Sequence, residues 1–300
     1  MTFPDIDPVL IQIGPFAIRW YALAYIAGIA VAWWYVRGLL MREGVWQDDK
    51  PPLSREQLND LMFWIVLGVL VGGRLGYVIF YAPSILSENP LHVFAVWRGG
   101  MSFHGGLMGV VVALVGFCRS KDISLLSLAD AAAIPTPLAL CFGRIANFIN
   151  GELWGRPTDA PWGIIFPHAG DFARHPSQLY HAALEGLLLF VVLHCLARYT
   201  DLLKRPGMLV GAFLIGYGIL RCVVEPFRAP EIFVGPAHYG VTMGIALSLP
   251  MILLGIGLLF YGFHRAAVPV SDPDSEVVET QTPKRKPSRL ERRKKKRFRQ

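Results

Sequence analysis

Residues 143–156 read Gly-Arg-Ile-Ala-Asn-Phe-Ile-Asn-Gly-Glu-Leu-Trp-Gly-Arg and form the polar end of a long hydrophobic segment. A charged residue at membrane depth costs about 2.5–3.5 kcal/mol on insertion scales, so such residues usually face a protein interior and mark a functional site. Arg144 and Asn147 are three residues apart, which places both on one face of a helix. The glycines that follow predict a tight, non-helical exit from the membrane.

The composition of the 300-residue chain indicates a polytopic membrane protein. Hydrophobic residues make up 53% of it, charged residues 17%, and the mean hydropathy is +0.42. About 20 apolar residues are needed for a helix to cross the hydrocarbon core. We therefore expect an all-α fold with about seven transmembrane helices, in segments 15–37, 60–82, 104–118, 128–148, 177–197, 208–226 and 238–262. The third segment is short, and Pro135 and Pro137 predict a kink in the fourth.

The distribution of Lys and Arg predicts the orientation of these segments. Basic residues cluster in the loops after the first, third and fifth segments and in the tail, all of which would lie on one side. The positive-inside rule makes that side cytoplasmic, so we expect the amino terminus outside and the carboxyl terminus in the cytoplasm. No cleavable signal peptide is expected, because the start lacks a basic n-region and the first segment is long enough to span.

The chain is expected to contain two parts, a transmembrane catalytic domain over 1–263 and a basic cytoplasmic tail over 264–300. The tail carries 12 of the 29 Lys and Arg but only 5 of the 22 Asp and Glu, so we expect it to be disordered. Attraction to anionic lipid is its favoured role, and nucleic-acid binding is not expected. Aromatic residues of an outer segment, 149–176, are interpreted as interfacial anchors, with the lining of a substrate entrance as the alternative.

Polar residues within the apolar segments gather near the predicted outer surface. Tyr217, Arg221, Glu225 and Arg228 are spaced by four, four and three residues and share one helical stripe. The other segments contribute Tyr21, Arg74, Tyr77, His104, Arg144 and Asn147. Three arginines from three different helices, Arg74, Arg144 and Arg221, predict an anion site, because a guanidinium donates two parallel hydrogen bonds to phosphate and stays charged when desolvated. The alternative is that each arginine reaches the interface or pairs structurally, as Arg221 with Glu225 would.

One histidine is a candidate general base. His104 lies in a glycine-rich run, 99–106, beside the predicted anion site. The other histidines, among them His181, lack comparable support. Neither an HExxH nor a CxxC motif occurs, so we expect no metal and no cofactor, and we interpret the four cysteines as packing residues.

Six motifs of the chain resemble the bacterial prolipoprotein diacylglyceryl transferases. They are Arg19-Trp20-Tyr21, Gly72–Tyr77, Gly99–Gly106, Gly143–Arg156, Arg174–Tyr180 and Gly216–Arg228, and the resemblance covers the chain up to about residue 263. It implies an enzyme of the bacterial inner membrane with its active site toward the outer leaflet. Such an enzyme transfers the diacylglyceryl group of phosphatidylglycerol to the lipobox cysteine of a preprolipoprotein, forms a thioether and releases glycerol 1-phosphate.

The resemblance also implies which residues are catalytic and which bind the lipid. The residues that it implies are catalytic are Tyr21, His104, Arg144, Asn147, Tyr217, Arg221 and Glu225. For phosphatidylglycerol binding it points to Arg144, Arg221, Asn147, Gly155, Arg74, Tyr77, Glu152 and Arg228. The chain departs from the family pattern around 167–174, at Pro226, and at His181, where a carboxylate would be expected.

The implied reaction breaks an alkyl C–O bond, so catalysis acts on the leaving group and on the nucleophile. Our hypothesis assigns Arg144 and Arg221 to the leaving phosphate and His104 to deprotonation of the thiol. Two other classes of protein stay open. Another outer-leaflet phospholipid headgroup transferase fits the arginines and the histidine equally well. An anion transporter predicts polar residues through the full membrane depth, whereas here the inner halves of the segments are nearly all apolar.

Overall fold

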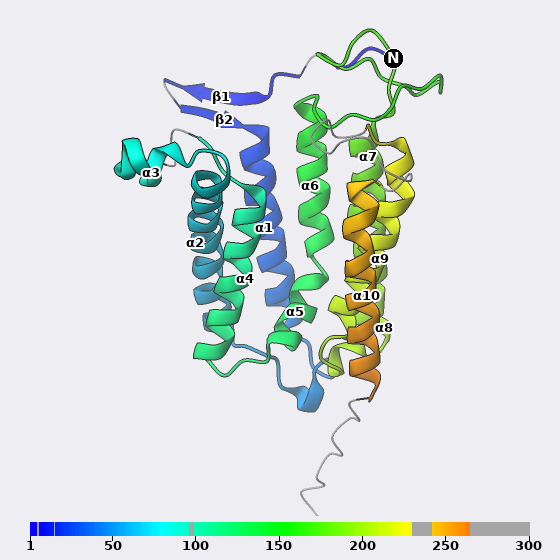
Figure 1. The fold of residues 1–300 in the computed structure, drawn as a ribbon. Helices are drawn as coiled ribbons and strands as arrows, with labels where there is room; N and C mark the ends of the chain where they lie inside the picture. The colour runs from blue at the N-terminus through cyan, green and yellow to red at the C-terminus, as the bar shows by residue number, and fades with distance from the viewer. Residues whose placement is uncertain (5, 15, 96–98, 230–241, 265–300) are drawn as a thin grey trace, which may run out of the picture. The chain divides into compact units, whose positions relative to one another are not determined.

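The computed structural model describes residues 1–300 except 5, 15, 96–98, 230–241 and 265–300. The described part is a bundle of helices that run alternately up and down (Figure 1). Its regular elements are β1 Val9–Ile13, β2 Phe16–Arg19, α1 Trp20–Leu39, η1 Gln47–Asp49, α2 Arg55–Phe80, α3 Ser84–Glu88, η2 Pro90–Phe94, α4 Phe103–Ser120, α5 Leu125–Ala133, α6 Thr136–Ile149, α7 Ser177–His181, η4 Ala182–Leu188, α8 Leu189–Tyr199, η5 Leu202–Lys204, α9 Met208–Val224, η6 Glu225–Phe227 and α10 Met243–His264.

The described helices include five or six candidate membrane spans. Five are long and apolar enough to cross a membrane, namely Trp20–Leu39, Arg55–Tyr81, Ser177–Tyr199, Met208–Phe227 and Met243–His264. The pair α5 and α6 makes a sixth if it counts as one span. Its bend of 46° falls at the prolines, which confirms the predicted kink. Because α4 is shorter, length alone does not confirm the seven predicted spans.

The amino-terminal boundary of the first helix was predicted wrongly. Residues Val9–Ile13 pair antiparallel with Phe16–Arg19, and α1 begins only at Trp20. The segment is rich in β-branched residues, which favour strands, and Gly14 supplies a positive φ of 56° at the turn. The predicted all-α fold therefore gains a short hairpin. Of the last predicted segment, residues 238–241 lie outside the described residues.

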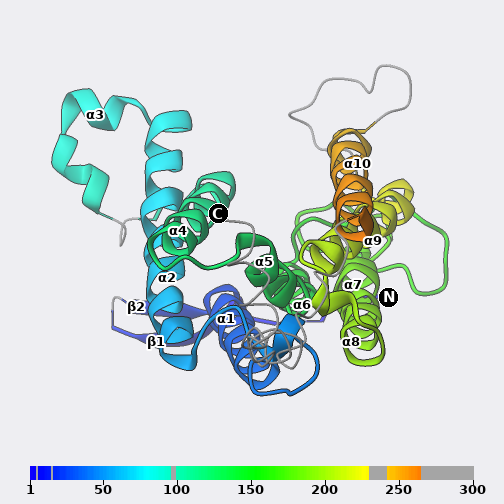
Figure 2. The same ribbon diagram turned by 90° about the horizontal axis from the view of Figure 1, so that it is seen from below.

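Glycines allow α2 and α4 to lie in direct backbone contact. Gly68, Gly72 and Gly76 of α2 face Gly105 and Gly109 of α4, and a Cβ added at any of them would overlap the opposing helix. Small residues favour helix association in membranes, where lipid offers no hydrophobic driving force between helices. The pair lies on one side of the bundle, α7 to α10 lie on the other, and α1, α5 and α6 lie between (Figures 1 and 2).

The main apolar core occupies one end of the bundle. It includes buried Leu61 of α2, Leu128 of α5, Leu193 of α8 and Leu209 of α9. The connections α1–α2, α4–α5 and α8–α9, which carry the predicted cytoplasmic charges, lie at this end (Figure 1). The hairpin and the segment 150–176 lie at the other end, where the polar residues of α6, α7 and α9 are found.

Candidate active site

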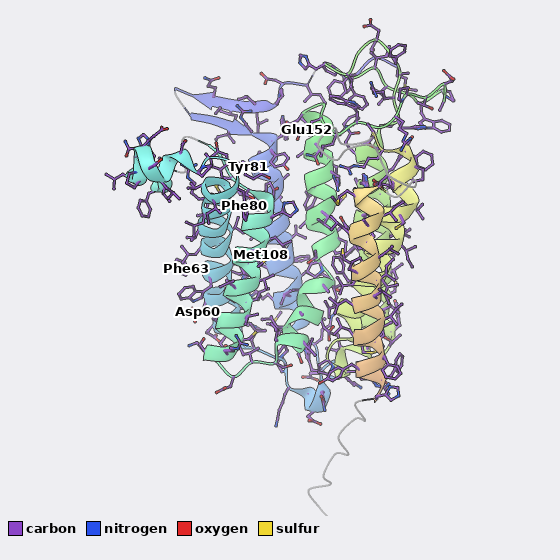
Figure 3. The ribbon with its side chains drawn as sticks, viewed as in Figure 1. Asp60, Phe63, Phe80, Tyr81, Met108 and Glu152 are labelled. Atoms are coloured by element: carbon purple, nitrogen blue, oxygen red, sulfur yellow. The ribbon has the colours of Figure 1, made fainter. Side chains whose placement is uncertain are left out.

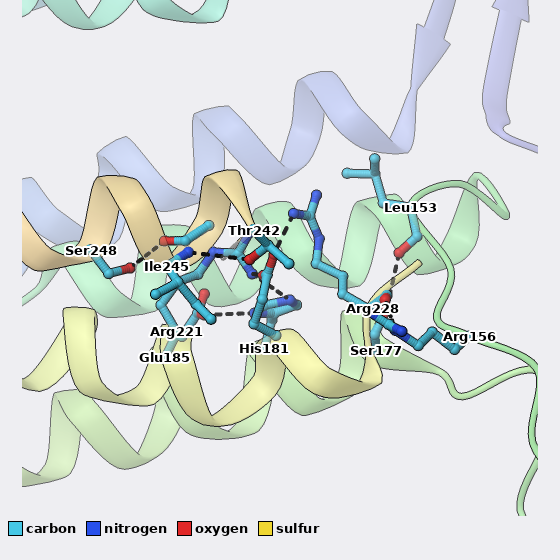
Figure 4. Close-up of polar contacts among 12 residues, drawn as sticks. Leu153, Arg156, Ser177, His181, Glu185, Arg221, Arg228, Thr242, Ile245 and Ser248 are labelled. Carbon is cyan, nitrogen blue, oxygen red and sulfur yellow. Dashed lines mark hydrogen bonds and ion pairs between the residues drawn. The ribbon is translucent and has the colours of Figure 1, made fainter. Parts of the chain in front are cut away.

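A chain of polar side chains joins α6, η4, α7 and α9. Figure 4 shows the part of it that contains Glu185, His181 and Arg221. Nη2 of Arg144 lies 3.9 Å from Oε2 of Glu185, whose Oε1 lies 2.6 Å from Nδ1 of His181. Nε2 of His181 in turn lies 3.3 Å from Nη1 of Arg221. The Glu185 side chain is 1% exposed, whereas Arg144 is 20% exposed. The carboxylate is therefore buried, whereas the Arg144 side chain stays partly accessible.

The chain continues along α9 and η6. Nη1 of Arg221 lies 2.9 Å from Oε2 of Glu225, and Nη1 of Arg228 lies 4.0 Å from the same oxygen. The predicted stripe of this helix is confirmed, and so is the Arg221–Glu225 pairing that the sequence allowed. Pro226 ends the α-helix, because α9 stops at Val224 and a 3₁₀ turn follows.

A close approach of η4 to α6 brings Glu185 to Arg144. The segment Ala182–Leu188 is π-helical, a form that is rare and frequent at functional sites. Gly186 within it packs against Cys141 of α6, where an added Cβ would come within 2.5 Å of the cysteine Cβ. The missing side chain at 186 thus lets the buried carboxylate reach across to the arginine.

Tyrosines surround the accessible Arg144. Tyr217 of α9 interacts electrostatically with both Arg144 and Glu185. On the α1 side, Tyr25 interacts with Arg144 and Glu152, and its hydroxyl donates to the Tyr21 hydroxyl at 3.3 Å. The structure therefore brings together Arg144, Tyr217 and Arg221 and links Tyr21 to them through Tyr25.

The predicted tight exit after α6 is confirmed. The helix ends at Ile149, and Gly151 follows with a positive φ of 63°. Nδ2 of Asn147 and Nδ2 of Asn150 donate to Oε1 of Glu152 at 2.8 and 3.3 Å. Nε2 of Gln178 donates to the Glu152 carbonyl at 2.6 Å, which fixes the exit to α7.

Gly155 lies where three segments meet. Its N–H donates to the His175 carbonyl at 2.9 Å, and the Arg156 N–H donates to the Phe227 carbonyl at 2.9 Å. A Cβ at 155 would come within 2.5 Å of the Phe227 oxygen and 2.6 Å of the His175 oxygen. Only a glycine fits between these carbonyls, and the contact places Arg228 beside the outer segment.

Arg74 occupies a different environment from the one predicted. Its guanidinium donates to four backbone carbonyls, so at most one of its five N–H groups is left for a ligand. Arg74 is only 5% exposed, and its Cζ lies 5.5 Å from the centre of the Tyr77 ring. The four acceptors are the carbonyls of His92, Val93, Gly99 and Gly100. Arg74 thus fixes the segment that leads into α4, and the structure does not bring it into the Arg144–Arg221 cluster.

His104 lies on the α2–α4 pair. It is exposed and lines a largely apolar groove of about 1480 Å³ along that pair. Phe63, Phe80 and Met108, which line the same groove, point outward from these helices (Figure 3). The Arg144–Arg221 cluster, in contrast, is formed by α6, η4, α7 and α9.

Sequence reasoning missed two residues at the centre of the cluster, His181 and Glu185. His181 was judged to lack support, and Glu185 was not singled out. A usable signal existed, because Glu185 is the only acidic residue within Ser177–Tyr199. A lone carboxylate in an apolar span indicates a buried polar partner.

The fold and the site together define a class, a multi-pass helical membrane protein with an arginine-rich polar cluster at one end of its bundle. Known proteins specify the family. The family model for prolipoprotein diacylglyceryl transferase matches residues 8–261. The chain belongs to the prolipoprotein diacylglyceryl transferase family.

Individual relatives cover nearly the whole chain, and each is named phosphatidylglycerol–prolipoprotein diacylglyceryl transferase. The one from Rhodospirillum rubrum is 53% identical over 275 residues, which is 91% of this chain and 97% of the relative. The one from Rhodopseudomonas palustris is 49% identical over 282 residues, 93% and 98% of the two chains. The one from Phenylobacterium zucineum is 46% identical over 284 residues, 91% and 98%.

Proposed function

We propose that this protein transfers the diacylglyceryl group of phosphatidylglycerol to the lipobox cysteine of a preprolipoprotein. Family membership over residues 8–261 supports the reaction. One structural observation supports the place where it occurs: Arg144 and Arg221 are held by buried carboxylates while Arg144 stays 20% exposed. Arginines held in this way are suited to a phosphate, because their donors are oriented before the ligand arrives.

The reaction requires assistance both at the nucleophile and at the leaving group. The cysteine thiol loses its proton and the sulfur attacks the glycerol carbon bonded to phosphate, so a C–S bond forms as the C–O bond breaks. The electron pair of that bond goes to the phosphate oxygen, and glycerol 1-phosphate leaves with an additional negative charge. Arg144 and Arg221 stabilise that charge, most strongly where water is excluded.

We assign deprotonation of the thiol to His104. The imidazole is exposed, and a thiol whose pKa is near 8.5 is mostly protonated at neutral pH. The groove that His104 lines on α2 and α4 is apolar over most of its length, which suits acyl chains or the hydrophobic part of a signal sequence.

The remaining candidate residues orient the headgroup or hold its ligands in place. Tyr21, Asn147 and Tyr217 are proposed to contact headgroup oxygens, and Glu225 holds Arg221. Glu152 holds Asn147, and Gly155 positions Arg228. For Arg74 and Tyr77, the contacts to the segment before α4 favour an indirect role in lipid binding, through the placement of His104.

We further propose a bacterial inner-membrane protein with seven spans, α4 included, and an active site toward the outer leaflet. The amino terminus would lie outside. The candidate site supports this orientation because it lies at the end of the bundle opposite the basic connections (Figure 1). Residues 1–263 form the catalytic domain in this proposal. The tail, 264–300, lies outside the described residues apart from His264 and is proposed to be a cytoplasmic segment that binds anionic lipid.

The experiment is thioether formation on a lipobox peptide by the purified full-length protein in detergent with phosphatidylglycerol. Arg144→Ala and Arg221→Ala are expected to abolish turnover while the protein stays folded by thermal melting. Full activity in either variant would refute the phosphate assignment. Near-normal activity in His104→Gln would show that another group is the base and would leave the phosphate assignment unchanged. Release of glycerol phosphate without a lipobox cysteine would indicate a different headgroup transferase.

A further inference from the structure

We propose that His181 and Glu185 form a positioning pair that holds Arg144 and Arg221 in the orientation that binds phosphate, and that the pair works only while His181 is neutral. The proposal rests on the proposed function, since it deepens the account of the same phosphate site. Neither residue is accessible to substrate, because each is 1% exposed. Their role is therefore exerted through the two arginines that flank them.

The hydrogen-bond pattern defines the state of the imidazole. Oε1 of Glu185 is an acceptor only, so the 2.6 Å contact to Nδ1 requires that Nδ1 carry a proton. Nη1 of Arg221 is a donor only, so the 3.3 Å contact to Nε2 is a hydrogen bond when Nε2 carries none. Both contacts are satisfied by one neutral tautomer of His181.

Each partner of the pair also serves one arginine. Oε2 of Glu185 points to Arg144 at 3.9 Å, while Nε2 of His181 accepts from Arg221. The pair thus joins α6 to α9 through α7 and η4. A single buried bridge fixes both guanidinium groups, and this is how a site is made ready for an anion before the anion binds.

Protonation of His181 would break this bridge on one side. An imidazolium presents an N–H to the N–H of Arg221, so two donors and two positive charges would face each other. The charged groups around His181 are Arg144 of α6, Arg221 of α9 and Glu185 of η4. Tyr217 of α9 interacts with the same three groups. Beyond them, Glu225 pairs with Arg221. Arg221 would lose the His181 contact and keep only its pairing with Glu225, so phosphate affinity would fall as the pH is lowered.

The test is the pH dependence of phosphatidylglycerol binding, followed by the rise in melting temperature that the lipid gives the full-length protein in detergent. Binding is the correct readout because it does not involve the general base. Phosphatidylcholine serves as the reference lipid. Wild-type protein is expected to lose the phosphatidylglycerol-specific shift at acid pH. His181→Gln supplies an amide that donates to Glu185 and accepts from Arg221 at every pH, so it is expected to keep the shift.

Three further variants complete the design. His181→Leu removes both contacts and is expected to raise the KM for phosphatidylglycerol about tenfold to hundredfold, the range for loss of a charged hydrogen bond. Glu185→Gln, which keeps the shape of the side chain, is expected to weaken lipid binding at neutral pH. His194→Gln is the matched control: this histidine lies on α8 and contacts the Tyr35 hydroxyl at 2.8 Å, and its charged neighbours are Arg42 and Arg198 rather than Arg144 and Arg221.

Two results would overturn the positioning role. One is a His181→Gln protein that loses lipid binding at acid pH as the wild type does. The other is a folded His181→Leu protein with wild-type KM and wild-type lipid binding. Failure of the proposed function would look different, because the wild type would then bind phosphatidylglycerol in a His181-dependent way without modifying the lipobox peptide.

Discussion

Asn147 donates its side-chain amide to the Glu152 carboxylate at 2.8 Å, across the point where α6 ends and the chain leaves the bundle. The contact joins the last turn of the helix to the non-helical exit that follows. Asn150 donates to the same oxygen, and the Glu152 carbonyl accepts from Gln178. The segment that follows α6 is therefore held both to the end of α6 and to α7.

The role of this contact can be tested by exchanging its donor and its acceptor. Asn147→Asp places two carboxylates at hydrogen-bond distance, and the repulsion is expected to lower lipid transfer at least tenfold. Adding Glu152→Gln supplies a donor opposite the new acceptor and is expected to recover part of the loss. Transfer to a lipobox peptide is measured for both single variants and the double variant. If the double variant transfers lipid no faster than the slower of the two single variants, the contact with Glu152 does not explain the importance of Asn147.

Gly155 is predicted to tolerate no side chain. Gly155→Ala would push apart the carbonyls of His175 and Phe227 and displace Arg228, at a cost of about 1–3 kcal/mol of stability for an overpacked position. Activity should fall with it. Gly143→Ala is the control within the same motif, because a Cβ there meets nothing within 4 Å. Equal melting temperatures and equal activities for the two variants would disprove the prediction.

Gly244 of α10 makes room for the Glu225 carboxylate. A Cβ at 244 would come within 2.5 to 2.6 Å of the carboxylate atoms, so Gly244→Ala is expected to displace Glu225 and loosen Arg221. We expect a raised KM for phosphatidylglycerol with a folded protein. Gly257→Ala on the same helix meets nothing within 4 Å and is expected to behave as wild type. A normal KM in Gly244→Ala would show that Arg221 does not depend on Glu225.

Asp130 is predicted to be important for stability rather than catalysis. This fully buried carboxylate accepts from the N–H groups of Gly207 and Val210 at 2.7 and 2.8 Å, at the start of α9. Asp130→Ala leaves both donors without that acceptor, and each such donor costs about 1–3 kcal/mol. The melting temperature should fall markedly, with residual activity per folded molecule unchanged.

Asp201→Ala is the control for that measurement. Lys204 pairs with this exposed carboxylate at 2.8 Å and holds its pKa below the ordinary value. Exposed ion pairs contribute little to stability, so the melting temperature should stay at the wild-type value. A similar fall in melting temperature in both variants would contradict the prediction that Asp130 stabilises the start of α9.

Much of the bundle could be predicted because the constraints are local. The apolar segments follow from the length of a membrane span, and the bend between α5 and α6 follows from Pro135. The stripe that carries Arg221 and Glu225 follows from helical periodicity within one segment. The exception was the first helix, where the sequence is apolar enough to span but also suits strands, so hydrophobicity alone did not locate the hairpin.

The sequence by itself determined the family, the helical segments and most of the polar residues that gather at one end of the bundle, because motifs, length and periodicity can be read along the chain. Only the tertiary structure decided which of those residues meet. It placed Arg74 among backbone carbonyls and His104 on the α2–α4 pair, and it put His181 and Glu185 between Arg144 and Arg221. The reason is physical: a buried charge needs a partner, and that partner lies on another helix, brought near by packing at a glycine such as Gly186.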